Sequence, residues 1–204
     1  ESVQKKKIIL IGVGGIGCPV AQYLVASGIK RLTLIDYDKV ELTNLNRQVL
    51  YSIKDLNRKK VEVAKEKLQG TNPNCNIKAI SLKLKKDNFR NLLLEPSLII
   101  DTTDNWSSMV LINEYCVKNS IPLISASVIG YDGQAILFKN INNQHLCLNC
   151  IYPNILEPDL ARCDTIGVLG TTAGLTGLIV AQMCINFVTK NYENLDKLVM
   201  INSK

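Results

Sequence analysis

Short apolar runs and segments of helical spacing alternate along most of the chain. Apolar side chains recur at the three- and four-residue spacing of a helix in Val20–Val25, Arg58–Leu68 and Met109–Val117. Between them lie runs of strand length, which are Ile8–Ile11, Leu32–Ile35, Ile77–Ile80, Ser97–Ile100 and Leu123–Ala126. Strands that alternate with helices are typical of an α/β fold, because each crossover helix returns the chain to the same edge of a parallel sheet. The pattern therefore predicts a doubly wound, mainly parallel sheet with flanking helices.

Three segments depart from this alternation. Asp38–Lys54 is polar and aperiodic, and its content of Asn and charged residues predicts that it lies outside the core. Gln134–Phe138 follows Gly133 and is expected to be the second arm of a turn. Leu198–Ile201 is expected to form a last short strand.

The stretch Ile166–Val188 has no charged residue and is long enough to cross a membrane. It is also rich in glycine, threonine and amide side chains, which is unusual for a lone span in lipid. We interpret it as a buried core or interface helix and expect no membrane contact. The spacing of Gly170 and Gly174 permits the close approach of another helix.

The composition is that of a folded protein in a reducing compartment. Of the 204 residues, 47% are hydrophobic and 21% charged, which predicts one folded domain over residues 1–204 and excludes a disordered chain. Seven cysteines, an odd number, and no secretory signal pattern favour a cytoplasmic location with free, metal-bound or catalytic thiols. The net charge of +6 suits an anionic ligand. The lysine groups are scattered and lack aromatic neighbours, so we expect no nucleic-acid partner.

A glycine-rich turn connects the first predicted strand to the first predicted helix. Its pattern is Gly12-x-Gly14-x-x-Gly17, and Asp36 ends the next strand. Such a turn lets backbone N–H groups approach a phosphate at the positive end of a helix, and a carboxylate at this spacing binds ribose hydroxyls. The context favours nucleotide binding in a Rossmann-like fold over a purely structural turn. These residues do not distinguish NAD from ATP.

Two cations follow the ribose carboxylate. Arg47 lies in the polar segment after Asp36, and Lys60 begins the next helical pattern. An enzyme that transfers a nucleotidyl group needs cations to neutralise a triphosphate, whereas a dehydrogenase needs little positive charge here. Taken alone, Arg47 can be a solvated surface charge and Lys60 an ordinary lysine at a helix start.

The segment Asp101–Asn105 follows a buried strand directly. Ligands of open α/β sheets bind at the carboxyl ends of strands, where an Asp can hold Mg²⁺ against phosphate oxygens. The alternative is an N-cap for the following helix, which fits Asp101 better than Asp104.

Cys147 and Cys150 form a C-x-x-C pair. This spacing suits two ligands of a tetrahedral Zn²⁺. A redox pair is the alternative, but that motif is expected to open a helix near the start of a βαβ unit. Here the pair follows a strand and precedes Tyr152 and Pro153, so we favour zinc.

Taken together, these segments resemble the MoeB/ThiF/HesA family, relatives of ubiquitin-activating enzymes. The resemblance covers nearly the whole chain in family order, and it is the combination of segments that makes it specific. The segments are GVGGIG, LTLIDYDKVELTNLNRQ, the lysine of KKVEVAKEKL, DTTDN, GYDGQ and CLNCIYP.

The resemblance implies a homodimer that uses ATP and Mg²⁺ to adenylate the C-terminal carboxylate of a ubiquitin-like sulfur carrier of ThiS/MoaD type, releasing pyrophosphate. Asp36 would hold the ribose, Arg47 and Lys60 would neutralise phosphates, and Asp104 would hold Mg²⁺ and act in catalysis. The implied nucleotide-binding positions are Gly12, Gly14, Gly15, Gly17, Asp36, Asp38, Thr43, Asn44, Leu45, Asn46, Arg47, Gln48, Lys60, Asp104 and Asn105.

Cys163 falls where several members of this family keep a cysteine that forms a thioester or persulfide with the carrier. The alternative is an inert loop cysteine. The other cysteines are interpreted as packing residues, and they are Cys18, Cys75, Cys116 and Cys184.

The sequence also departs from the family pattern. It lacks the usual N-terminal helical segment, whose Arg reaches the partner subunit's ATP, and the second C-x-x-C of zinc-binding members. We therefore expect a chain without that N-terminal segment and without a C-terminal tail. Met109 and Gly130 stand where the family often has Arg, which removes positive charge near the expected phosphate or carboxylate site.

Three alternatives remain at this point. The same chemistry can act on a short peptide or on a tRNA-linked carboxylate. An NAD-dependent oxidoreductase shares Gly12, Gly14, Gly17 and Asp36 but has no need of the cations. A catalytically silent dimerisation partner would keep only the fold.

Overall fold

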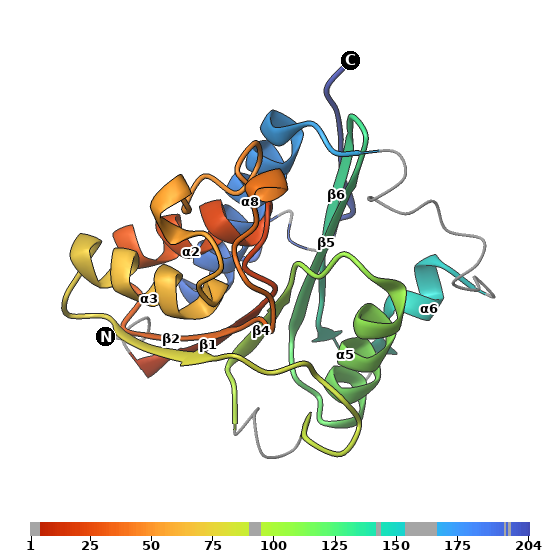
Figure 1. Ribbon diagram of the computed structural model, residues 1–204. Coiled ribbons are helices and arrows are strands. Elements are labelled where there is room, and N and C mark those ends of the chain that lie inside the picture. The colour runs from red at the N-terminus through yellow and green to blue at the C-terminus, as the bar shows by residue number, and fades with distance from the viewer. Residues whose placement is uncertain (1–4, 90–94, 142–143, 154–166, 194, 196) are drawn as a thin grey trace.

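The computed structural model describes residues 5–89, 95–141, 144–153, 167–193, 195 and 197–204 (Figure 1). Its centre is a seven-stranded sheet in the order β3-β2-β1-β4-β5-β6-β9. Strands β3 to β5 run parallel, β6 is antiparallel to β5, and β9 is antiparallel to β6. The strands are β1 (Lys7–Ile11), β2 (Arg31–Ile35), β3 (Asn76–Ile80), β4 (Leu98–Asp101), β5 (Leu123–Ile129), β6 (Asp132–Phe138) and β9 (Val199–Asn202), with a separate ribbon of β7 (Asn140–Ile141) and β8 (Gln144–His145). The predicted doubly wound, mainly parallel sheet is confirmed.

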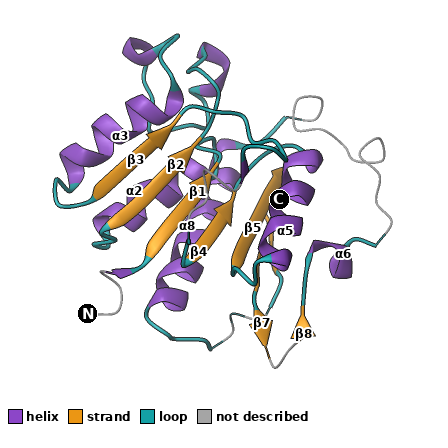
Figure 2. Ribbon diagram, turned by 90° about the horizontal axis from the view of Figure 1, so that it is seen from below, coloured by secondary structure: helices purple, strands orange, loops and turns teal. Residues whose placement is uncertain are grey.

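Helices cover both faces of the sheet (Figures 1 and 2). One face carries α2 (Gly17–Ala26), α3 (Lys60–Thr71) and α8 (Gly170–Val188), and the other carries α5 (Trp106–Lys118) and the short α6 (Leu148–Ile151). Successive strand residues point to opposite faces, so Ile8 and Leu10 pack under the first group while Ile9 and Ile11 pack under the second. A strand buried on both sides explains why the predicted strands read as continuous apolar runs.

Helix α8 packs against α2 and the sheet. A Cβ atom on its Gly177 would lie 2.4 Å from Pro19 Cγ, so only glycine allows the two helices to come this close. In the part of the chain that the structure describes, α8 is the one helix with the length and hydropathy of a membrane span, and 50% of that window is buried inside the fold. This partial burial agrees with the prediction of a buried core or interface helix.

The segment between β2 and α3 corrects one expectation. Its polar, aperiodic sequence predicted that Asp38–Lys54 lies outside the core, but several of its side chains are buried. The buried residues are Val40, Asn44, Gln48, Leu50 and Tyr51. Two short 3-10 helices, η1 (Leu42–Asn44) and η2 (Ile53–Asp55), fold the segment over the carboxyl edge of the sheet. The periodicity was missing because these short turns repeat no strand or helix geometry.

Candidate nucleotide site

The glycine-rich turn is held close to the end of β4. Gly12 has φ +86°, and a Cβ there would lie 2.8 Å from the carbonyl oxygen of Thr102. The Thr102 hydroxyl donates to the Gly12 carbonyl at 2.7 Å. Gly17 is equally confined, because its Cβ would lie 2.1 Å from the Gly12 carbonyl oxygen. These contacts bring the start of α2 to the same edge as the ends of β1 and β4.

The start of α2 is open to an anion. Its first turn holds no acidic residue, and no side chain caps it. Among the described residues, no protein acceptor takes the N–H groups of Gly14 or Gly15. Unpaired N–H groups at the positive end of a helix dipole form an anion-binding site. The geometry predicted for this turn is thus present.

Asp36 lies directly behind this turn. One carboxylate oxygen accepts the Val13 N–H at 2.8 Å and the other accepts the Asp38 N–H at 2.9 Å. The residue is only 9% exposed, and its burial raises the pKa of the Asp36 carboxyl, although Lys60 and the two N–H donors oppose that increase. The carboxylate is therefore fixed at the end of β2, where a ribose would lie in a fold of this kind.

Lys60 is the first residue of α3 but is not a surface lysine. It is 5% exposed, and its Nζ donates to Asp38 Oδ2 at 3.1 Å. Its backbone N–H also donates to the Asp38 carbonyl at 3.0 Å. A buried ammonium beside Asp36 and Asp38 places positive charge at the predicted site. The interpretation of Lys60 as an ordinary lysine at a helix start is therefore wrong.

Arg47 lies beside the glycine-rich turn. A Cβ on Gly15 would lie 3.5 Å from Arg47 Cγ and 3.2 Å from Ala173 Cβ. The guanidinium donates to the Thr43 carbonyl and to Asn46 Oδ1, both at 3.1 Å. Arg47 therefore stands at the predicted loop, held by two polar neighbours in its own segment.

The remaining predicted positions of this segment have different surroundings. Gln48 is buried, its Nε2 would lie 3.6 Å from a Cβ on Gly14, and its Oε1 has no partner within the described part of the chain. Asn44 is buried and exchanges capping hydrogen bonds with Glu41 around η1. Leu45 packs against the core. Gln48 thus faces the turn, whereas Asn44 and Leu45 build the segment that carries it.

The loop after β4 corrects a second expectation. The N-cap of α5 is Asn105, whose Oδ1 accepts the Ser108 N–H at 2.9 Å, so Asp101 does not cap the helix. Asp101 is fully buried, with one oxygen bonded to Thr103 and the other without a partner among the described residues. Asp104 is exposed. Burial raises the pKa of Tyr37, the residue after Asp36, and the charges of Asp38 and Asp104 add to that increase.

These residues fit a nucleoside triphosphate. The N–H groups of Gly14 and Gly15 and the cations of Arg47 and Lys60 are complementary to phosphate oxygens. The unpartnered buried oxygen of Gln48 can accept a hydrogen bond from a hydroxyl group. A side chain in place of Gly15 would crowd Ala173 and occupy space beside the glycine-rich turn. Asp104 offers the carboxylate oxygen that Mg²⁺ prefers, at the same edge of the sheet.

The Cys147–Cys150 pair fits half of a zinc site. One argument against a redox pair is corrected, because Cys147 is the N-cap of α6 and the pair does open a short helix, although this helix does not begin a βαβ unit. The two Sγ atoms lie 3.5 Å apart, close to the separation of about 3.8 Å between two thiolates on a tetrahedral zinc with Zn–S bonds of about 2.3 Å. The described residues contain no group of three or more His, Cys, Asp or Glu side chains, so they supply two ligands. Cys163 lies outside the described residues. Among the remaining cysteines the packing interpretation is confirmed, since Cys18, Cys75, Cys116 and Cys184 are buried.

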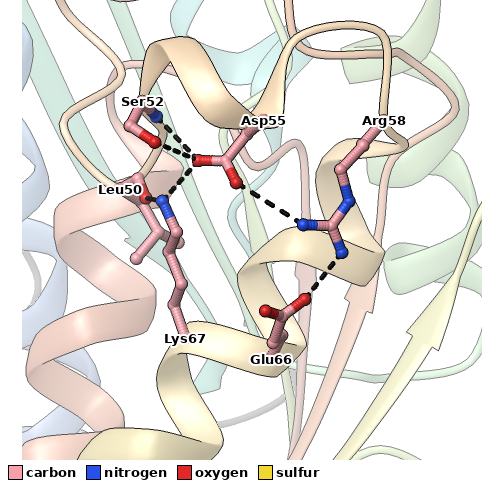
Figure 3. A network of polar contacts seen from close by, with 6 residues as sticks. All are labelled: Leu50, Ser52, Asp55, Arg58, Glu66 and Lys67. Carbon is pink, nitrogen blue, oxygen red and sulfur yellow. Dashed lines mark hydrogen bonds and ion pairs between the residues drawn. The ribbon is translucent and has the colours of Figure 1, made fainter.

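A polar network that the sequence did not predict supports the site (Figure 3). Lys67 on α3 reaches back to Leu50 and Asp55, and Arg58 joins Asp55 to Glu66. Beside it, the Tyr51 hydroxyl donates to the Val13 carbonyl at 2.9 Å. No local signal marks these residues, because their partners lie in other segments of the chain.

A Rossmann-like sheet with an open glycine-rich turn, a buried ribose-type carboxylate and two cations at one edge defines a nucleotide-binding protein. The chain belongs to the ThiF family, whose sequence model matches residues 1–204. The match confirms the resemblance that the motifs indicated.

Two named relatives show which kind of nucleotide-binding protein this chain resembles. The sulfur carrier protein ThiS adenylyltransferase of Escherichia coli (strain K12) is 33% identical over 189 residues, covering 93% of this chain and 74% of that protein. The adenylyltransferase and sulfurtransferase UBA4 of Meyerozyma guilliermondii is 38% identical over 192 residues, covering 92% of this chain but 44% of that protein. Because these relatives are adenylyltransferases, the chain is a nucleotidyltransferase.

Solved structures share the fold. Escherichia coli MccB with MccA-N7isoASN superposes with a TM-score of 0.84 at 23% identity, covering 99% of this chain and 65% of that chain. MccB with ATP superposes with a TM-score of 0.80, also at 23% identity and with the same coverage. This likeness confirms the Rossmann-like fold class.

Proposed function

We propose that the protein adenylates the C-terminal carboxylate of a ubiquitin-like sulfur carrier of ThiS/MoaD type. The observation that carries the proposal is the convergence of the Gly14–Gly15 turn, Arg47, Lys60 and Asp36 at one edge of the sheet. A dehydrogenase has no use for a buried lysine beside its ribose carboxylate. A nucleotidyl transfer between two anions requires such positive charge.

The chemistry needs no nucleophile from the protein. A carboxylate oxygen of the substrate attacks the α-phosphorus of ATP, the bond to the bridging oxygen breaks, and pyrophosphate leaves with that electron pair. In this reaction Asp36 binds the ribose, Arg47 and Lys60 neutralise phosphates, and Asp104 holds Mg²⁺. When bound, Mg²⁺ supplies further charge neutralisation. Positioning and electrostatics therefore provide most of the rate acceleration.

The substrate class rests on the relatives. The similarity to a ThiS adenylyltransferase covers most of both chains and supports a sulfur-carrier substrate. A short peptide substrate is the alternative, since the fold is shared with MccB crystallised with MccA. We propose the carrier because the relative that names one is 33% identical to this chain, whereas MccB is 23% identical.

We also propose that Cys147 and Cys150 bind zinc together with ligands outside the described residues. The short helix α6 that follows Cys147 is anchored at both ends. The Leu148 N–H donates to Asn113 Oδ1 at 2.9 Å, and the Tyr152 hydroxyl donates to Gln134 Oε1. Elemental analysis of the purified protein is expected to show zinc that is lost in Cys147→Ser.

We further propose a homodimer in the cytoplasm. Helix α8 exposes Leu175 and Leu178, large apolar side chains one turn apart, and these would be covered by a second copy. Sedimentation velocity tests the assembly. A dimeric wild type and a monomeric Leu178→Glu variant are expected, and a monomeric wild type would contradict the proposal.

The central test is pyrophosphate exchange. The protein is incubated with ATP, Mg²⁺, labelled pyrophosphate and a ThiS-type carrier, and intact-mass measurement looks for AMP added to the carrier. We expect exchange that requires the carrier and is lost when its last residue is removed. Stabilisation against heat by NAD and not by ATP, without exchange, would refute the proposal and favour the oxidoreductase alternative.

A further inference from the structure

The segment 41–59 carries Arg47 and Gln48 but has little regular structure of its own. It contains only η1 and η2, and one isolated bridge between Lys39 and Lys59 closes its base. The backbone hydrogen bonds in its middle, such as those from the Gln48 N–H to Asn44 and from the Tyr51 N–H to Gln48, are turns within the segment and do not tie it to another element. The position of the middle depends on side chains that reach it from elsewhere.

Asp55 is the centre of these contacts. Its Oδ2 accepts the Ser52 N–H and hydroxyl, each at 2.8 Å, and the Lys67 ammonium at 2.5 Å (Figure 3). Its Oδ1 lies 3.6 Å from the Arg58 guanidinium. Burial would raise the pKa of the Asp55 carboxyl, but the bonds from Lys67 and Ser52 outweigh burial and keep it below its usual value. Asp55 is therefore an ionised carboxylate, and both of its oxygens contact polar groups of other residues.

Lys67 ties two points of the segment to one helix. Its Nζ donates to the Leu50 carbonyl at 2.9 Å as well as to Asp55. Lys67 lies on α3, two helical turns after Lys60, so the segment is fixed against the same helix that positions the buried ammonium. A cation that bridges a carbonyl and a buried carboxylate is a strong tie.

Tyr51 continues the path into the glycine-rich turn. It directly follows Leu50, and its buried hydroxyl donates to the Val13 carbonyl at 2.9 Å. Val13 precedes Gly14, against which Gln48 rests. Two hydrogen bonds, linked by the peptide bond between Leu50 and Tyr51, therefore connect Lys67 to the turn.

We propose that Lys67 and Tyr51 are positioning residues for the phosphate half of the nucleotide site. They act through the segment that holds Arg47 and Gln48 against the glycine-rich turn. The ribose half depends on Asp36, which β2 and the Val13 N–H hold in place. This inference rests on the proposed nucleotide function. It goes beyond that function by predicting that the two halves of the site depend on different supports.

The test compares ATP with adenosine, which lacks phosphates. Dissociation constants of both are measured by NMR titration of the full chain for wild type, Lys67→Met, Lys67→Arg and Tyr51→Phe. The matched control is Lys65→Met, the same substitution two residues earlier on α3 at a lysine that makes none of these contacts.

We expect Lys67→Met to weaken ATP binding about 10-fold and Tyr51→Phe about 3-fold, with adenosine binding within about 2-fold of wild type. Lys67→Arg should restore ATP affinity, because a guanidinium can reach the same two oxygens. The control should match wild type for both ligands. Tyr51→Phe keeps the buried ring, so this variant still tests the positioning role if Lys67→Met does not fold.

Two results would overturn the inference. Equal weakening of ATP and adenosine would show a general structural role, and unchanged ATP affinity in both variants would show no role. In either case wild-type binding of ATP leaves the proposed function standing. A wild type that binds neither ligand would instead refute the proposed function and the positioning role together.

Discussion

The buried carboxyl of Asp101 makes the stability of the fold depend on pH. Burial raises the pKa of Asp101 to about 6 and the charge of Asp104 adds to this, while the hydrogen bonds from Thr103 oppose it. In the unfolded chain the same group titrates near 3.8. Between these two values the native state holds a proton that the unfolded chain has released. The free energy of unfolding must therefore fall as the pH rises through this window.

The size of the effect follows from the two pKa values. The pKa of Asp101 differs by about 2 units between the native and unfolded states, which changes the free energy of unfolding by about 3 kcal/mol over the whole titration. About 1.4 kcal/mol of this change falls between about pH 5 and pH 8. Asp101→Asn removes the titrating group and keeps an oxygen that can accept from Thr103. Relative to this variant, the wild type should lose about 1.4 kcal/mol of stability between the two pH values.

Urea denaturation of both proteins at the two pH values measures this difference. Other carboxyls titrate alike in both proteins, so their contributions largely cancel in the comparison. The reasoning is refuted if the wild type and Asp101→Asn differ by the same amount at both pH values. If the wild type gains stability relative to the variant as the pH rises, the predicted direction of the pH dependence is wrong as well.

Three further predictions follow from the geometry. Lys60→Met should lower the rate of pyrophosphate exchange on the order of 10²-fold, and a variant with unchanged exchange would exclude Lys60 from the reaction. Gly17→Ala should cost about 3 kcal/mol in urea denaturation, because its Cβ would lie 2.1 Å from the Gly12 carbonyl oxygen, and a cost near zero would contradict that close contact. Burial raises the pKa of Cys18 to about 12. After a chelator has removed any zinc, native-state labelling with iodoacetamide, read by peptide mass spectrometry, should therefore modify Cys147 and leave Cys18 unmodified.

The sequence predicts well what repeats locally. The strand, turn and helix from Ile8 to Val25 follow directly from apolar periodicity and glycine spacing, and Asp36 lies where that spacing places it. The buried state of Lys60 does not follow from the sequence, because it depends on Asp38 lying opposite the start of α3. Local pattern therefore predicts which elements meet, and tertiary contacts decide which side chains are buried there.

The two corrections have the same physical origin. Asp101 has the residue type and position of a helix cap, but β4 continues through it and the cap passes to Asn105. The segment after β2 reads as solvent-exposed, but Leu50 and Tyr51 enter the core through turns that repeat no period. Lys67 gave no signal at all, since a lysine on an amphipathic helix ordinarily faces water.

The hydrogen bond from the Val13 N–H to Asp36 is made between two groups of the protein itself. It locks the glycine-rich turn onto the end of β2 and already aims the carboxylate. A nucleotide therefore meets a carboxylate whose direction the fold has already set, and little of its binding energy is spent on ordering this group.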